Sequence, residues 1–444
     1  MIAVLQATGW YPPRHMGGTE VYLTGLVREL RALNIGSRII APLGPEAADG
    51  YEFDGTVVRT YPVNPAPSRA ELRGGTPQQG LERFSQILAE ERPDIYHQHS
   101  WSGELGGAHL RAAREAGLKT VLTVHTPTSI CLRGTMVRFG REACDGLIDP
   151  PLCGACWSHE RGAPAIFAHA LGAMPVAVSS SLARSIPAGR VARAFSARSL
   201  AERRKSEFAR MVADADSIVA VCAWVFDALE RNGVPRERLV LSRQGVDPAF
   251  AAEAAGSFER KERDRDGAFQ LLYFGHWHPV KGIDVLIRAV RALPAEVGLK
   301  LFIHGVSNCA EDRDYAAAMR RLAAGDPRIA FEPPIPRPQL AATLSRASAL
   351  AVPSLWLETG PLVVLEAKAS GLPIIGSRLG GIAELVREPE DGMLVPPGDV
   401  MAWAAAIKTM ASARPARALI SELGDVRTMR EVARDMATLY NSLC

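Results

Sequence analysis

Short apolar segments alternate with amphipathic helical patterns along most of the 444 residues. In the first half, strands are predicted at Ile2–Thr8, Arg38–Pro42, Asp94–His99, Thr120–His125, Pro175–Ser179, Ser217–Ala223 and Leu239–Arg243. Apolar residues at helical spacing predict a helix over Glu20–Asn34. Strands separated by helices are typical of parallel sheets with right-handed crossovers.

A charged segment at 256–267, within Ala251–Phe269, has no apolar period and predicts a solvated linker. Beyond it the alternation returns, with strands predicted at Gln270–Phe274, Lys300–His304, Ile329–Glu332, Leu350–Pro353 and Pro373–Ser377. The intervening helices are predicted at Ile283–Leu293, Asp314–Ala324, Pro338–Ala347, Pro361–Ser370 and Ile382–Arg387. A short strand is expected near 392–395.

The pattern therefore predicts an α/β chain with two doubly wound, Rossmann-like domains. We place the first at 1–250 and the second at 268–425, and expect a C-terminal helix at 426–444 to pack back on the first domain. Domains of this kind bind ligands at the carboxyl ends of their strands, so the cleft between the two is the expected site.

Composition narrows the class of protein only slightly. Apolar residues make up 47% and charged residues 22%, and the net charge of +3 argues against a nucleic-acid partner. Met1–Gln6 predicts a first strand rather than a signal peptide, so we expect a cytoplasmic protein with reduced cysteines. The uncharged stretch Gly162–Leu182 contains two prolines and is expected to be a buried segment rather than a membrane span.

Four cysteines cluster in a Gly/Pro/Arg-rich insertion at 126–160 that follows the fourth strand: Cys131, Cys144, Cys153 and Cys156. Four thiols in a reducing compartment suggest a structural tetrahedral zinc site. Only Cys153 and Cys156 have the two-residue spacing common in zinc motifs, so buried free thiols and an iron–sulfur cluster stay open as alternatives.

Basic residues dominate 184–210, where eight arginines and lysines stand against two glutamates. Such a segment suits an anionic membrane surface, at the inner face of the membrane, or a lipid-pyrophosphate acceptor. It is equally typical of a solvated helix face, and both interpretations stay open.

The segment 357–366 carries the most informative chemistry. Pro361 is expected as the first helical residue with Gly360 as its cap, so free amides near Leu362 and the helix dipole favour an anion at this helix start. Glu358 and Glu366 flank that position and suit a ligand that combines diphosphate with hydroxyls. The alternative is that Glu358 is a helix-start charge and Glu366 a solvated helix residue.

A glycine pair, Gly380-Gly381, lies between the next strand and helix, where backbone can approach a ligand closely. With Glu358, Glu366, Glu384 and the segment 394–399, this pair resembles the C-terminal block of family-four retaining glycosyltransferases. The resemblance implies the GT-B fold, two Rossmann-like domains facing across a cleft. It also implies that Glu358 contacts the donor sugar near its anomeric centre, that Glu366 binds ribose hydroxyls, and that amides at the helix start hold the diphosphate.

The segment 274–284 departs from the family at one position. The family has an arginine after the glycine and a lysine before the next glycine, both neutralising the leaving diphosphate. Lys281 matches the lysine, but His276 replaces the arginine. A histidine supplies only part of an arginine's charge at neutral pH and no bidentate fork, so Arg243 or Arg378 is an alternative diphosphate contact.

In the first domain, Gly17-Gly18 lies between the first strand and helix and matches the family's loop next to the donor diphosphate and sugar. His125 ends a predicted strand and matches the family histidine that contacts a donor-sugar hydroxyl. His97 and His99 end a neighbouring strand, and one of them is a candidate for the acceptor side.

The resemblance implies a retaining hexosyltransferase that uses a UDP- or GDP-sugar and a glycan or lipid-linked glycan acceptor, as in the biosynthesis of a cell-surface polysaccharide. Such chemistry requires no cofactor or divalent metal. The alternatives are a catalytically silent nucleotide-sugar binding protein, a GT-B phosphorylase or epimerase, and a metal- or redox-sensing module built on the cysteines.

Overall fold

The computed structural model describes residues 2–13, 17–44, 50–63, 80–102, 104–186, 189–261, 268–307, 309–413 and 426–444. The chain forms two compact units. Unit 1 comprises Met1–Arg243 and Arg430–Cys444, and unit 2 comprises Gln244–Met429. Both units are Rossmann-like, so the chain has the α/β fold expected from its alternating pattern.

Unit 1 is built on an eight-stranded sheet in the order β10-β9-β6-β5-β1-β2-β4-β3. Its strands are β1 (Ala3–Ala7), β2 (Gly36–Leu43), β3 (Gly50–Phe53), β4 (Thr56–Pro62), β5 (Ile95–Gln98), β6 (Lys119–Val124), β9 (Ser217–Ala220) and β10 (Leu239–Leu241). All neighbours are parallel except β3 and β4, an antiparallel pair that the apolar pattern did not reveal.

The helices next to this sheet are α1 (Gly18–Ala32), α3 (Leu81–Glu91), α4 (Gly107–Glu115), α10 (Ala223–Arg231) and α18 (Met429–Leu443). The apolar stripe of α1 is buried, including Leu23, Leu26 and Leu30. From α18, the buried Tyr440 hydroxyl accepts a hydrogen bond from Gln6 Nε2 of β1 and is hydrogen-bonded to His97 Nδ1 of β5 at 2.6 Å. The last helix of the chain is thus part of the core of unit 1.

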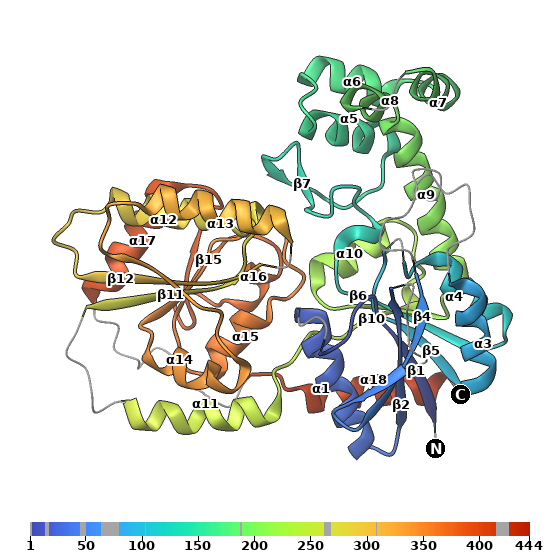
Figure 1. The fold of residues 1–444 in the computed structure, drawn as a ribbon, viewed down its shortest axis with the longest axis horizontal. Coiled ribbons are helices and arrows are strands. Elements are labelled where there is room, and N and C mark those ends of the chain that lie inside the picture. The colour runs from blue at the N-terminus through green and yellow to red at the C-terminus, as the bar shows by residue number, and fades with distance from the viewer. Residues whose placement is uncertain are drawn as a thin grey trace. The chain divides into compact units, whose positions relative to one another are not determined.

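A helical lobe extends unit 1 beyond its sheet (Figure 1). It contains β7 (Val137–Arg138), β8 (Glu142–Ala143), α5 (Pro150–Glu160), α6 (Ala165–Ala173), α7 (Val176–Ser185), α8 (Arg190–Phe195) and α9 (Ala197–Asp214). The strand predicted at Pro175–Ser179 is wrong, because Pro175 is the N-cap of α7. A short apolar run does not by itself distinguish a strand from a helix.

The expectation that 162–182 is buried is also wrong. Ile166 and Phe167 of α6 are 84% and 67% exposed, and Val176 and Val178 of α7 are exposed as well. Among the described residues, no single helix is long and apolar enough to span a membrane; α6 and α7 reach that threshold only together and meet at an angle of 112°.

Unit 2 contains a six-stranded, wholly parallel sheet in the order β13-β12-β11-β14-β15-β16. Its strands are β11 (Phe269–His276), β12 (Leu299–Val306), β13 (Ile329–Glu332), β14 (Ala349–Val352), β15 (Ile374–Ser377) and β16 (Gly392–Val395). The strand order reverses between β11 and β14, so the loops that follow these two strands lie side by side.

Helices cover both faces of this sheet (Figure 1). One face packs against α12 (Ile283–Ala292), α13 (Ala310–Ala323) and α17 (Val400–Ala413), and the other packs against α11 (Pro248–Lys261), α14 (Leu340–Arg346), α15 (Leu362–Ala369) and α16 (Gly380–Leu385). The first part of the expected linker is therefore helical. Residues 262–267, and 414–425 at the expected end of the second domain, lie outside the described residues.

Candidate functional site

In unit 2, Lys281 and Glu358 form an ion pair, with 2.7 Å between Lys281 Nζ and Glu358 Oε1. Ser354 Oγ donates to the same carboxylate oxygen, also at 2.7 Å. The Lys281 ammonium lies 5.2 Å from the centre of the Trp356 ring. Glu358 and Ser354 are buried, whereas Lys281 is partly exposed, so the pair joins a buried acid to a cation that solutes can reach.

Backbone packing brings these two side chains together. Gly282 has φ of 67°, and a Cβ there would lie 2.0 Å from the Pro353 carbonyl oxygen. The Leu355 amide donates to the Val280 carbonyl at 2.7 Å. The loop after β11 therefore lies directly on the loop after β14, which requires glycine at position 282.

Glu366 is buried on α15 and forms an ion pair with Arg337, which belongs to the 3₁₀ turn Arg337–Gln339. The interpretation of Glu366 as a solvated helix residue is therefore wrong. Sequence reasoning missed Arg337, since the Pro-Arg-Pro segment around it indicates only a turn. It missed Ser354 and Trp356 too, although both lie in the loop that carries Glu358.

The start of α15 differs by one residue from the prediction. Pro361 is the N-cap and Leu362 the first helical residue, while Gly360 has φ of 128° before them. The amides of the first turn remain at the carboxyl edge of the sheet, where backbone N–H groups favour an anion.

The glycine pair at the start of α16 has a packing role. A Cβ on Gly381 would lie 2.7 Å from the Gly360 amide nitrogen, and the Gly381 amide donates to the Glu358 carbonyl at 2.7 Å. Gly380 has φ of 52° and an equally close approach to the 357–358 backbone. The pair thus allows the turn to hold the loop that carries Glu358.

His276 is the last residue of β11 and is partly exposed at the carboxyl edge. Its carbonyl accepts a hydrogen bond from the Tyr273 hydroxyl at 3.2 Å. Of the two arginines considered as substitutes, Arg378 forms an ion pair with Glu388 at 2.8 Å. The other, Arg243, belongs to unit 1, whereas His276 belongs to unit 2.

In unit 1, the three histidines at the ends of β5 and β6 form a buried network. His99 Nε2 lies 2.8 Å from Gln6 Oε1, and His99 Nδ1 lies 3.1 Å from His125 Nε2. Tyr22 packs edge-on against the His125 ring with 4.6 Å between ring centres. Both ring nitrogens of His97 have partners within the protein, Tyr440 Oη and Thr123 Oγ1, which indicates a structural role for His97.

The hydrogen bonds determine the tautomers in this network. The Gln6 carbonyl oxygen can only accept, so His99 Nε2 carries a proton and His99 Nδ1 accepts from His125 Nε2. His125 Nδ1 is therefore an acceptor. Burial lowers the pKa of His125 to about 3 and that of His97 to about 3, and burial also lowers the pKa of His99 well below its usual value. The network is uncharged at neutral pH.

Gly17 and Gly18 begin α1, and the Gly17 amide donates to the Glu20 carboxylate at 2.7 Å. No described atom lies within 4 Å of a Cβ built on Gly18, so packing among the described residues does not require glycine there.

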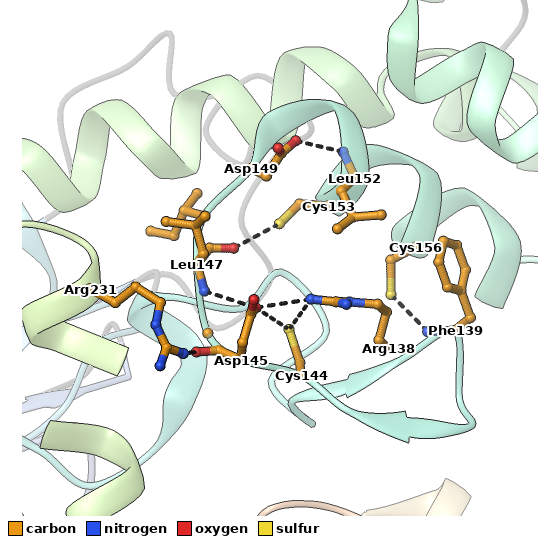
Figure 2. A network of polar contacts seen from close by, with 12 residues as sticks. Arg138, Phe139, Cys144, Asp145, Leu147, Asp149, Leu152, Cys153, Cys156 and Arg231 are labelled. Atoms are coloured by element: carbon orange, nitrogen blue, oxygen red, sulfur yellow. Dashed lines mark hydrogen bonds and ion pairs between the residues drawn. The ribbon is translucent and has the colours of Figure 1, made fainter. Parts of the chain in front are cut away.

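The four clustered cysteines line one mostly apolar cavity of about 40 Å³ in the helical lobe. Cys153 and Cys156 lie one turn apart on α5, with Cys144 on the loop after β8 (Figure 2). Burial raises the pKa of the Cys153 thiol to about 12 and raises the pKa of Cys144. As their side chains are now oriented, no three His, Cys, Asp or Glu residues of the described ranges form a metal-binding group.

Each half of the chain matches a known family of glycosyltransferases. Residues 16–250 match Glycosyltransferase Family 4, and residues 268–413 match the Glycosyl transferases group 1 family. The protein named D-inositol 3-phosphate glycosyltransferase 1 of Catenulispora acidiphila is 29% identical over 415 residues, 89% of this chain and 82% of that protein. The D-inositol 3-phosphate glycosyltransferase of Pseudarthrobacter chlorophenolicus is 29% identical over 209 residues, 46% of this chain and 47% of that protein. The chain thus matches about half the length of several such relatives.

Solved structures share the fold at low identity. Sucrose-phosphate synthase from Thermosynechococcus elongatus has a TM-score of 0.67 and 20% identity, with 100% of this chain and 99% of that chain covered. HepE of Anabaena, solved in complex with UDP-glucose, has a TM-score of 0.62 and 16% identity, with both chains covered completely.

Proposed function

Because the chain belongs to Glycosyltransferase Family 4, we propose that it transfers a hexose, with retention, from a UDP- or GDP-sugar to a hydroxyl of a glycan or lipid-linked glycan. The observation that carries this proposal is the Lys281–Glu358 pair beside the start of α15. The UDP and UDP-glucose bound by HepE favour UDP as the nucleotide.

In the proposed reaction, the bond between the anomeric carbon and the diphosphate oxygen breaks while the acceptor hydroxyl attacks from the same face. The acceptor's proton leaves with the diphosphate. Lys281 and the amides at the start of α15 stabilise the negative charge that develops on the departing group. Glu358, buried and held by Ser354, places its carboxylate against the donor sugar.

Glu366 would bind the ribose hydroxyls, since a carboxylate held by an ion pair accepts hydrogen bonds in a fixed direction. His125 would accept a hydrogen bond from a donor-sugar hydroxyl through Nδ1, as its tautomer allows. Its neutral state suits this role, because a charged imidazolium has no acceptor. No cofactor enters these steps.

The first experiment combines purified protein with UDP- and GDP-hexoses and measures thermal shift and nucleotide release. We expect a shift with one nucleotide series and release that rises when a glycan acceptor is added. A shift without release under every acceptor condition would favour a silent nucleotide-sugar binding protein. Release that needs only inorganic phosphate would favour a phosphorylase, and conversion of the donor sugar without any acceptor would favour an epimerase.

Variants of Glu366 and Glu358 distinguish the roles proposed for these two residues. We expect Glu366→Gln to raise the KM for the donor and Glu358→Gln to lower kcat by about 100-fold or more, the usual loss when a transition-state contact is removed. Glu296→Gln is the matched control, since Glu296 is exposed at the opposite, amino edge of the same sheet, just before β12. Near-native kinetics for both site variants would refute the assignment.

The acceptor side of the proposal rests on the helical lobe. Residues 161–200 contain five arginines and no aspartate or glutamate. Because the whole chain has a net charge of +3, the other residues together carry a net charge of −2. The exposed apolar side chains of α6, α7 and α8, which include Ile166, Phe167, Val178 and Val191, lie in the same segment. Apolar groups next to cations suit the surface of an anionic membrane, where a lipid-linked acceptor resides.

Vesicle co-sedimentation tests this membrane contact. We expect the protein to sediment with vesicles that contain phosphatidylglycerol, and each of Ile166→Ser and Phe167→Ser to weaken binding about tenfold, from the loss of one buried apolar side chain. Met401→Ser is the control, because Met401 of α17 is 68% exposed, like Phe167, but lies in unit 2. Equal binding to neutral vesicles, or equal loss with the control, would contradict a role for this surface.

A further inference from the structure

We propose that Cys131, Cys144, Cys153 and Cys156 bind one Zn²⁺ as four thiolates, and that this ion holds the segment 126–160 together. The inference does not depend on the donor or acceptor of the proposed transferase. It concerns a cavity in the helical lobe of unit 1.

The four sulfur atoms come from three separate stretches of chain. Cys131 follows the 3₁₀ turn Pro127–Ser129, Cys144 follows β8, and Cys153 and Cys156 lie on one face of α5. All four line the same cavity of about 40 Å³. A water molecule needs about 10–15 Å³ of such space, so the cavity can hold one ion.

Hydrogen-bond donors reach two of these sulfurs. The Phe139 amide donates to Cys156 Sγ at 3.3 Å, and Arg133 Nη1 donates to the same sulfur at 3.6 Å. Arg138 Nη2 lies 4.0 Å from Cys144 Sγ (Figure 2). Metal-bound thiolates characteristically accept N–H groups of this kind, which stabilise charge on sulfur.

Two nearby guanidinium groups also have an N–H group without an acceptor among the described residues. The Nε atoms of Arg138 and Arg204 are buried and have no hydrogen-bond partner among the described residues. Arg204 belongs to α9 and interacts electrostatically with Cys131. Four thiolates on Zn²⁺ carry a net charge of −2 and are acceptors that such buried donors lack.

To bind one ion, the thiols would turn toward a common centre and give up their present contacts. Cys153 Sγ now points at the Leu147 carbonyl at 4.0 Å, and Cys144 Sγ points at the Asp145 carboxylate at 3.8 Å. Both contacts are long, so thiols that deprotonate and bind Zn²⁺ give up only weak hydrogen bonds.

The segment has little regular structure of its own. Between β6 and α5, its regular structure is one 3₁₀ turn and a two-stranded ribbon of two residues per strand. Short segments with so little regular structure are commonly held by a metal or by disulfides. Cys131 lies six residues after His125, so the ion would also restrain the chain that leaves the proposed sugar contact.

Metal analysis of the full-length protein, purified without a metal-affinity step, tests the proposal. We expect about one zinc per chain, bound by four cysteines. It should be released when a mercurial titrates those thiols. Exchange with Co²⁺ alone should give the intense charge-transfer bands of tetrahedral cobalt thiolate, a readout independent of activity. Seven reactive thiols without zinc, disulfides among the four cysteines, or iron–sulfur absorbance would each overturn the proposal.

Variants assign the ligands. Cys131→Ser, Cys144→Ser, Cys153→Ser and Cys156→Ser should each lower zinc content and the melting temperature. Cys309→Ser is the matched control, because Cys309 is an exposed thiol of unit 2, and it should keep the full zinc content. Should the single variants not fold, the Co²⁺ spectrum of the unmodified chain still decides the outcome. Full zinc content in a soluble Cys153→Ser, Cys156→Ser double variant would refute the proposal.

Discussion

Acidification from pH 7 to pH 5 should destabilise unit 1. Three fully enclosed histidines of this unit, His97, His109 and His125, have pKa values that burial lowers to about 3. In the unfolded chain a histidine titrates near 6.5. As the pH falls below 6.5, the unfolded chain therefore takes up protons that the folded chain does not, and the free energy of unfolding decreases.

The magnitude follows from these pKa values. At pH 5 an unfolded histidine with pKa near 6.5 is almost fully protonated and a folded one with pKa near 3 is neutral, which costs about 2 kcal/mol per group relative to pH 7. These three groups together lower the free energy of unfolding by about 6 kcal/mol, comparable to the whole stability of many domains, and His99, whose pKa burial also lowers, adds to that loss. With a urea m-value of about 3 kcal/mol/M, the midpoint should fall by about 2 M or more.

Urea unfolding followed by hydrogen–deuterium exchange and mass spectrometry can resolve the two units. Peptides from β5 and β6 should lose protection at much lower urea concentration at pH 5 than at pH 7. A His109→Gln variant should lose about 2 kcal/mol of that pH dependence, because His109 packs against Phe84 and Tyr61, apart from the histidine network of β5 and β6. An unchanged midpoint for unit 1, or a variant with the full pH dependence, would refute the reasoning.

Three further predictions concern single substitutions. Tyr440→Phe should lower the free energy of unfolding by about 1–3 kcal/mol in urea titration, because His97 Nδ1 loses its buried hydroxyl partner; an unchanged midpoint would show that water replaces it. Gly18→Ala should leave the melting temperature unchanged or slightly raised, since a Cβ there meets no described atom, while donor affinity measured by calorimetry falls. Gly381→Ala should lower kcat about tenfold or more by displacing the Glu358 loop through a clash with the Gly360 amide, and native turnover would contradict that role.

The alternating pattern was sufficient to predict most of both sheets, because buried parallel strands are short apolar runs separated by amphipathic helices. It failed where the pattern is ambiguous. The apolar run at 175–179 is helical, and β3 and β4 form an antiparallel edge that carries no such signal. Burial was misjudged at α6 for a related reason, since sequence shows that a side chain is apolar but not whether another element covers it.

The residue types of the candidate site follow from local signals: glycines at turns, a proline at a helix start, and charged or imidazole groups after strands. Their partners do not. Lys281 lies 77 residues before Glu358, and Arg337 lies 29 residues before Glu366, so only the strand order of unit 2 brings each pair together.

In unit 1, too, the sequence determines which residues are present and the tertiary structure determines their partners. The sequence by itself determined that histidines end β5 and β6, because each follows an apolar run. The tertiary structure alone decided that they are buried, neutral and connected to Tyr440 from the far end of the chain. The physical reason is that a pKa, a tautomer and an ion pair depend on which groups surround an atom in space, and distance along the chain does not determine that.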